Sequence, residues 1–301
     1  MLNGCGGGGG GSSSQLTPLP AQENNSSETL DPNTDIFIPK ETFETPEYRN
    51  QWGLDFINAS DAYSYGASGK GVVVGVVDEA LDWGHHEFLK ENILHPDSIL
   101  MYSGNREPTP LEKFHGTATS SIIAGRKDNE PVDRNMHGVA YDAQILFIAI
   151  ELGSPPSDGE YEPIDIPAFS WERFDEQESK FYEELSSKSD VINNSFGFTG
   201  QITDYSKETL QNTFPKLINT FSSQQETIFV WSAGNYNGIT DTEGQQVNAA
   251  NPGILAGLGY YFPELAKNNV AVVAVDQEGE IADFSNRCGV AADFCIAAPG
   301  V

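Results

Sequence analysis

Short apolar runs recur along the chain and limit the folds that it can adopt more than any other feature. The clearest is VVVGVV at residues 72–77, and others occupy residues 145–150, 228–231 and 270–275. A shorter run begins at Val191. Such runs, which lack alternating polar residues, are typical of parallel strands that are covered on both faces of the sheet.

Helical patterns separate these runs. Residues 115–124 form one pattern, and two sets of apolar residues at helical spacing mark one face of two further helices. The first set is Trp171, Phe174, Phe181, Tyr182 and Leu185, and the second is Leu210, Phe214, Leu217, Ile218 and Phe221. Strands that alternate with helices predict an α/β fold, with a doubly wound, mostly parallel sheet and helices on both faces.

The composition excludes some partners. Asp and Glu number 44 and Lys and Arg 16, which gives a formal net charge of -28. A chain with so little positive charge lacks the basic surface that nucleic acids require, so we expect no nucleic-acid partner. Charge of this size also opposes self-association, and we expect a monomer. No apolar run reaches the roughly 18 residues that a membrane-spanning helix needs.

Residues 1–34 form a leader that is unlike the rest of the chain. Cys5 is followed by a run of glycines and serines, which is typical of a flexible tether. Leu2-Asn3-Gly4-Cys5 resembles the end of a bacterial lipoprotein signal, whose cysteine receives a lipid. An unmodified cysteine in a flexible leader is the alternative. We therefore predict lipidation at Cys5 and a single globular domain over residues 35–301.

Two further cysteines, Cys288 and Cys295, lie close together in the sequence. Close spacing across a short loop suits a disulfide in an oxidising compartment, and two buried thiols are the alternative.

Polar residues follow the predicted strands, where the functional groups of open parallel sheets gather. Asp78 follows the run at 72–77, and a rigid, partly desolvated carboxylate there would suit the orientation of a histidine. Asp82 competes for this role but lies further into the loop. A helix-capping role for Asp78 is one alternative. A dinucleotide site is another, but its glycines should follow the strand, and here they precede it.

His115 and Asn235 are the other candidates. His115 begins the helical segment 115–124, and Gly116 beside it would let a neighbouring backbone approach. Asn235 follows the strand at 228–231 and an Ala-Gly turn, from which its amide could reach a developing oxyanion. Taken singly, a lone histidine is more often structural, and asparagine is also common in turns for its backbone conformation.

Taken in order, these segments resemble the subtilisin-like serine peptidases, or subtilases. Val77-Asp78 resembles the family's aspartate motif, His115-Gly-Thr117 its histidine motif, and Ala233-Gly-Asn235 its oxyanion motif. The resemblance extends over roughly residues 50–301. It implies that Asp78 orients His115, that His115 is general base and then general acid, and that the Asn235 amide binds the oxyanion.

The resemblance also implies protein or peptide substrates. The residues that resemble the two edges of the primary specificity pocket are Ser195, Phe196, Gly197, Trp231, Ser232, Ala233 and Gly234. Such a pocket would accept apolar or aromatic side chains. Calcium is common in the family, but the sequence assigns no ligands to it, and we predict no metal site.

The nucleophilic serine of the family is missing. The final residues, CIAAPGV, form a strand-like run with an Ala298-Pro-Gly300 turn, which in subtilases precedes a Gly-Thr-Ser-x-Ala-x-Pro motif. No Gly-Thr-Ser occurs in the 301 residues, so we expect a truncated, incomplete domain that is inactive and less stable than the complete one. Glu79-Ala80 and Ala118 also depart from the family's usual residues.

A narrower resemblance concerns location. The leader, the Asn193–Gly197 run and the Cys288/Cys295 loop resemble surface-exposed autotransporter subtilases of Gram-negative bacteria. It implies an extracellular or cell-surface protein, which a lipid on Cys5 would attach to the outer membrane.

Two other functions compete with the peptidase. One is a catalytically dead, lipid-anchored binding protein on a protease fold. The other is a metal-dependent hydrolase that uses His85, His86 and Glu87. The second is disfavoured because adjacent histidines should point apart and no His-Glu-x-x-His motif occurs.

Overall fold

The computed structural model describes residues 37–94, 110–128, 136–149, 170–240 and 244–301. Cys5 and the rest of the predicted leader lie outside the described residues. Within the described part of the chain, no helix is long and apolar enough to cross a membrane.

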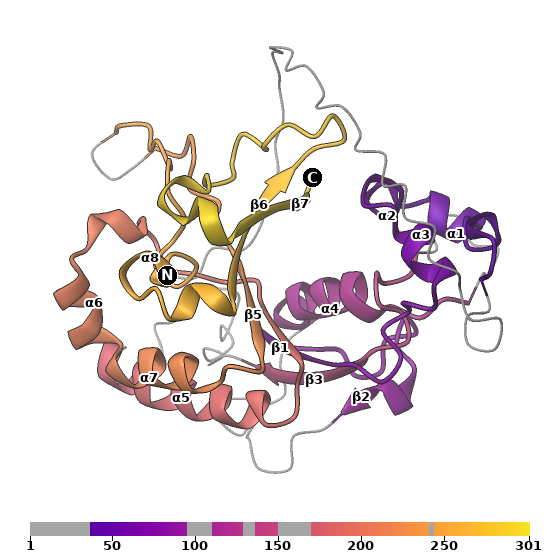
Figure 1. Cartoon of the computed structure of the whole chain (residues 1–301), viewed down its shortest axis with the longest axis horizontal. Coiled ribbons are helices and arrows are strands. Elements are labelled where there is room, and N and C mark those ends of the chain that lie inside the picture. Colours follow the sequence, from indigo (N-terminus) through magenta and orange to yellow (C-terminus); the bar gives the residue numbers. More distant parts are fainter. Residues whose placement is uncertain (1–36, 95–109, 129–135, 150–169, 241–243) are drawn as a thin grey trace, which may run out of the picture.

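A seven-stranded sheet forms the centre of the fold (Figure 1). Its strands are β1 (Val73–Asp78), β2 (Ile93–Leu94), β3 (Gln144–Ala149), β4 (Val191–Asn194), β5 (Ile228–Ser232), β6 (Asn269–Val275) and β7 (Cys295–Pro299). Their order in the sheet is β2-β3-β1-β4-β5-β6-β7, and each neighbouring pair is parallel. The predicted parallel, doubly wound sheet is confirmed, and the direction of winding reverses between β1 and β4.

Helices lie on both faces of this sheet and beside it. The helices of the described residues are α1 (Pro46–Arg49), α2 (Trp52–Phe56), α3 (Ala59–Ser64), α4 (Pro110–Ala124), α5 (Trp171–Ser186), α6 (Lys207–Thr213), α7 (Pro215–Ser223) and α8 (Leu258–Tyr261). Short 3-10 helices span Lys40–Thr42, Lys90–Asn92, Ile202–Asp204, Leu265–Lys267 and Gly289–Phe294. Figure 1 shows α4 on the opposite side of the central strands from α5 and α7.

Strand β1 contributes to the hydrophobic core on each side. Val74 and Val76 pack in the cluster that contains Ala124 of α4. Val77 points the other way, into the larger cluster with Leu185 of α5 and Leu217 of α7. An apolar run with no polar face is therefore needed, because both faces of the strand are covered.

Two helix predictions are corrected. The helix predicted at residues 115–124 begins at Pro110, so His115 lies inside it rather than at its start. The helical face predicted for 210–221 is buried, but it belongs to two helices, α6 and α7, which meet at Phe214 and Pro215. Proline has no N–H to donate and disfavours helical backbone in the residue before it, which ends α6.

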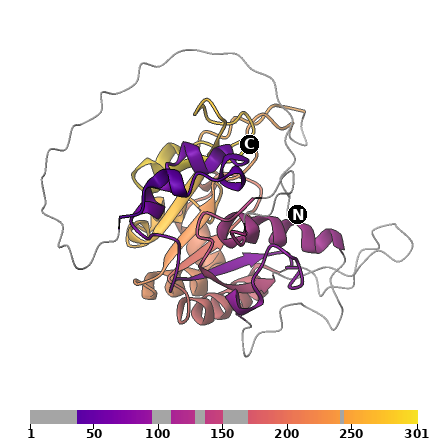
Figure 2. The same cartoon turned by 90° about the vertical axis from the view of Figure 1, so that its right-hand side faces the viewer.

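The amino-terminal helices pack at one end of the sheet. Tyr48, Leu54, Ala59 and Tyr63 form a small buried cluster of their own. The indole nitrogen of Trp52 donates to the carbonyl oxygen of Val301 (3.3 Å), so α2 lies against the last residues of the chain. Figure 2 shows the same relationship: the indigo helices lie beside the yellow carboxy-terminal segment.

Candidate active site

Asp78 and His115 form the centre of the candidate site. Asp78 is the last residue of β1, at the point where the winding of the sheet reverses, and only 1% of it is exposed. Its Oδ1 lies 2.7 Å from Nδ1 of His115. Crevices at such reversal points, at the carboxyl ends of parallel strands, are where ligands bind in open α/β sheets.

Two more donors hold the Asp78 carboxylate in place. The hydroxyl of Thr119 donates to Oδ2 (2.9 Å), and the N–H of Glu79 donates to Oδ1 (2.7 Å). An ionised carboxylate can only accept a hydrogen bond, so in a pair with ionised Asp78 the proton is on Nδ1 of His115, and Nε2 is the nitrogen that can accept one. The His115 side chain is 21% exposed, so solvent or substrate can reach the ring.

Gly116 lets the histidine helix approach β1. A Cβ at this position would collide with the carbonyl group of Ala80 and with the ring of Phe147. The expectation that Gly116 permits a close backbone approach is confirmed, and the approaching backbone is the loop that follows Asp78.

Asp82 does not compete for His115. Its Oδ1 accepts from the N–H of Gly84 (3.2 Å), and its own N–H donates to the hydroxyl of Thr117 (2.9 Å). These bonds fix the loop and tie it to α4. Asp82 therefore supports the loop around the Asp78–His115 pair without joining the pair.

Asn235 lies in the turn that follows β5, at the same edge of the sheet as Asp78. Gly234 precedes it with φ +113°, a conformation that favours glycine. Strand β4 separates β1 from β5, so the ends of the two strands are about 10 Å apart at a spacing of about 4.8 Å per strand. The Asn235 side chain is half-buried.

The residues predicted to edge a substrate pocket divide into two groups. Ser195, Phe196, Gly197, Ser232 and Gly234 are half-buried. Trp231 and Ala233 are each 1% exposed. The Trp231 ring lies in the core, where its Nε1 donates to Oδ1 of Asn269 (3.0 Å), so the ring cannot contact a substrate as the sequence interpretation had it. On β5, Phe229 and Trp231 are buried in the core, whereas Ile228, Val230 and Ser232 lie on the less buried face.

Cys288 and Cys295 form a disulfide, with their Cα atoms 5.8 Å apart. The bridge joins the loop before β7 to the first residue of that strand. It is the pairing that the sequence predicts for an oxidising compartment.

His85 and His86, the histidines of the disfavoured metal-hydrolase alternative, are arranged differently from the expectation. The rings of His85 and His86 lie 4.4 Å apart rather than pointing apart. Nε2 of His86 lies 3.2 Å from a carboxylate oxygen of Glu87. Across the described ranges, no three His, Cys, Asp or Glu side chains are grouped so that they could hold a metal ion.

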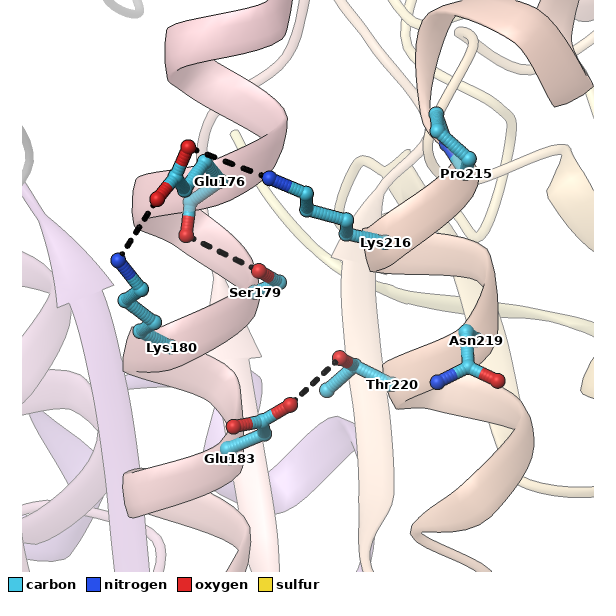
Figure 3. Close-up of a pocket in the computed structure, with 8 residues that line it drawn as sticks. All are labelled: Glu176, Ser179, Lys180, Glu183, Pro215, Lys216, Asn219 and Thr220. Carbon is cyan, nitrogen blue, oxygen red and sulfur yellow. Dashed lines mark hydrogen bonds and ion pairs between the residues drawn. The ribbon is translucent and has the colours of Figure 1, made fainter.

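A shallow groove between α5 and α7 lies away from these residues (Figure 3). Glu176 accepts from both of its lysines, Lys180 (2.9 Å) and Lys216 (3.2 Å). Glu183 accepts from the hydroxyl of Thr220 (3.4 Å). The polar groups that Figure 3 joins already satisfy one another, and none of the candidate catalytic residues lines this groove.

Two residues of the site escaped the sequence analysis. Thr119 follows His115 by four residues, so helical spacing alone places both on one face of α4, and this signal could have been used. Asn286 is fully buried and holds the turn at Asn235. No sequence pattern marks it, because its burial depends on loops that are distant in the sequence.

The comparison with protein families decides the class of the protein. The sequence model of the Subtilase family matches residues 69–301. The chain belongs to the subtilase family. Two of its curated relatives are named extracellular serine proteases, and the fold and family predicted from the sequence are confirmed.

Curated relatives are similar over most of this chain. An extracellular serine protease of Serratia marcescens is 25% identical over 299 residues, which cover 86% of this chain and 25% of the relative. Serotype-specific antigen 1 of Mannheimia haemolytica is 26% identical in an alignment 322 residues long, gaps included. This alignment covers 88% of this chain and 32% of the relative. The subtilase chain thus spans between a quarter and a third of the length of these relatives.

Solved structures show the same fold. The serine protease of Aeromonas sobria superposes with a TM-score of 0.58 at 21% identity, over 94% of this chain and 47% of that chain. MycP1 of Mycobacterium smegmatis superposes with a TM-score of 0.53 at 21% identity, over 90% of this chain and 65% of that chain.

Proposed function

We propose that this chain supplies the Asp, the His and the oxyanion Asn of a serine endopeptidase that hydrolyses peptide bonds in proteins. The observation that carries the proposal is the 2.7 Å contact between Asp78 Oδ1 and His115 Nδ1, at the winding reversal of a subtilase sheet. Asp78 would keep the imidazole in the tautomer whose Nε2 accepts a proton. His115 would take that proton from the nucleophile and return it to the leaving amine.

Asn235 would stabilise the negative charge of the tetrahedral intermediate. Its position in the turn after β5 supports this role, because the turn is fixed by a network of hydrogen bonds before any substrate binds. A donor that is already in place where charge develops needs no reorganisation during the reaction.

The nucleophile is the element that these residues lack. The 301 residues contain no Gly-Thr-Ser motif, and Ser120, on the same helix as His115, is fully buried. We propose that the serine belongs to a part of the protein outside this sequence. The 301 residues alone would then hydrolyse no peptides, because a triad acts as a unit.

An extracellular location is part of the proposal. Two relatives from Serratia marcescens are named extracellular serine proteases. The Cys288–Cys295 disulfide is consistent with an oxidising compartment. Attachment through a lipid on Cys5 stays a prediction and is tested by mass spectrometry of the amino-terminal peptide.

The decisive experiment uses the product of the whole gene. We expect a fluorophosphonate probe to label it on one serine and expect it to cleave casein, whereas the 301-residue chain does neither. Asp78→Asn should lower kcat by about 10⁴-fold, because the imidazole then favours the wrong tautomer. His86→Gln is the matched control, since that ring is an exposed histidine outside the pair.

Two results would contradict the proposal. One is a whole-gene product that cleaves casein equally well with Asp78→Asn. The other is a whole-gene product that no fluorophosphonate labels, which would favour a binding protein on a protease fold.

A further inference from the structure

Asn286 directs its hydrogen bonds to the turn that carries Asn235. It lies in the loop between β6 and β7 and is 0% exposed. We infer that Asn286 positions Asn235 for the oxyanion, as a residue that acts through Asn235 without touching the substrate. The inference rests on the proposed function, because it concerns the oxyanion site of the same peptidase.

The bonds of Asn286 reach both neighbours of Asn235. Its backbone N–H donates to the carbonyl oxygen of Gly234 (2.8 Å). Its Oδ1 accepts from the backbone N–H of Tyr236 (2.9 Å). One residue therefore holds the peptide groups on either side of Asn235, which limits how far the intervening residue can move.

The turn needs an external clamp because of Gly234. Glycine has the widest backbone freedom of any residue, and Gly234 adopts φ +113° here. A Cβ on Gly234 would lie 3.0 Å from Nδ2 of Asn286, so the Asn286 amide fills the space that a side chain at 234 would occupy. The freedom that lets the turn form is thus restrained by the residue packed against it.

A third bond anchors the clamp itself. Nδ2 of Asn286 donates to the carbonyl oxygen of Asn251 (3.1 Å). The N–H of Asn251 in turn donates to Oε1 of Gln201 (2.8 Å), on the segment that continues from β4. Oδ1 and Nδ2 of Asn286 therefore each make a hydrogen bond. Replacing Asn286 would leave the Tyr236 N–H and the Asn251 carbonyl without these partners, and it would also loosen the turn.

A purely structural role predicts a different result from a positioning role, and a pair of variants separates the two. In the whole-gene product, Asn235→Ala should lower kcat by about 100- to 1000-fold, the range measured for the corresponding donor in subtilisin itself. Asn286→Ala should lower kcat by about 10- to 100-fold with little change in KM, because small displacements of catalytic groups have effects of this size. In the Asn235→Ala background, Asn286→Ala should lower kcat no further.

Asn268→Ala is the matched control. Asn268 is also a buried asparagine, and its Nδ2 donates to the carbonyl oxygens of Gln224 (2.8 Å) and Thr227 (3.1 Å). These lie at the opposite, amino-terminal end of β5 and β6, far from Asn235. This variant should lose thermal stability as Asn286→Ala does but should keep its kcat.

The outcomes distinguish the inference from the function on which it rests. If Asn235→Ala leaves kcat unchanged, the oxyanion role of Asn235 fails, and the inference fails with it. If Asn235→Ala lowers kcat but Asn286→Ala does not, or if the two losses multiply in the double variant, Asn286 is structural and only the inference fails.

A second measurement does not depend on activity. In the 301-residue chain, Asn286→Asp keeps an oxygen for the Tyr236 N–H but removes the Nδ2 donor, whereas Asn286→Ala removes both. We expect hydrogen exchange of the Tyr236 amide to rise at least about tenfold in Asn286→Ala and less in Asn286→Asp. Unchanged exchange in Asn286→Ala, or an alanine variant that folds with the Asn235 side-chain NMR signals unshifted, would overturn the inference.

Discussion

Gly116 of α4 lies against the carbonyl group of Ala80, with no room between them for a side chain. Ala80 follows Asp78 by two residues, and Gly116 follows His115 by one. This close approach between the helix and the loop after β1 therefore lies beside the Asp78–His115 contact. Packing at this glycine determines whether the carboxylate and the imidazole are within hydrogen-bonding distance.

We expect Gly116→Ala to separate the pair. The added methyl group must push α4 away from the loop, at a cost of about 1–3 kcal/mol in the free energy of unfolding. Urea unfolding measures that loss, and the low-field NMR signal of the proton between Asp78 and His115 should weaken or disappear. Gly84→Ala is the control, because a Cβ there meets only an ordinary contact with Asp82. A normal low-field signal in Gly116→Ala would contradict the argument.

A buried carboxylate should matter more than the exposed ion pairs beside it. Asp175 of α5 accepts from the backbone N–H groups of Lys216 (3.0 Å) and Leu217 (2.9 Å), so it caps the first turn of α7. Asp175→Ala leaves both donors without this partner, and we expect a loss of about 1–3 kcal/mol in the free energy of unfolding.

Glu176→Gln is the matched control for Asp175→Ala. The adjacent Glu176 pairs with Lys180 and Lys216 at the surface (Figure 3), where solvent screens such pairs. We expect its thermal midpoint to be that of the wild type. An equal loss of stability in the two variants would show that the capping of α7 by Asp175 contributes no more than the exposed ion pairs of Glu176.

Site residues that lie directly beside an apolar strand or helix pattern can be predicted from the sequence. Asp78 is predictable because it follows an uninterrupted buried run, and His115 because it precedes an apolar helical face. The break between α6 and α7 does not follow from apolar spacing, which indicates the buried face and not whether the backbone is continuous. The proline at position 215 is the residue that indicates the break.

Asn286 and the Trp231 ring show where sequence reasoning stops. Neither the full burial of Asn286 nor the inward direction of Trp231 follows from the neighbouring residues. The first depends on the turn after β5 and the Asn251 segment converging on one amide. The second depends on which face of β5 a side chain points to, because Trp231 lies on the buried face and Ser232 on the less buried one.

The stability of the chain should fall in mild acid because of His137. This histidine is fully buried among the rings of Tyr48, Tyr63 and Tyr141, and Nδ1 pairs with the carbonyl oxygen of Gly138 (2.8 Å). Among the described residues, Nε2 has no hydrogen-bond partner. Burial lowers the pKa of His137, while the Gly138 carbonyl and the charge of Glu47 oppose the shift and Lys127 adds to it.

Protonation therefore favours the unfolded chain, whose histidine has a pKa of about 6.5. As the pH falls below that value, the unfolded state takes up the proton first and stability is lost, by at most about 1.4 kcal/mol per pH unit, until the lowered pKa of the folded state is reached. We expect the free energy of unfolding, measured with urea at several pH values, to change less with pH in His137→Gln than in the wild type. His86→Gln, at an exposed position, should show the wild-type dependence of the free energy of unfolding on pH. The same dependence in all three proteins would refute the assignment to His137.

The disulfide should stabilise the last strand of the sheet. Cys288 and Cys295 are 7 residues apart, and Cys295 begins β7, the strand at one end of the strand order. Closing a loop of this size is worth about 2–3 kcal/mol through the entropy of the unfolded chain. We expect reduction by dithiothreitol to lower the urea midpoint of the wild type and to speed hydrogen exchange of the β7 amides. The Cys288→Ser/Cys295→Ser variant should match the reduced protein and show no response to dithiothreitol. A wild-type midpoint that stays constant after both thiols are shown to be free would mean that packing against β6 alone holds β7.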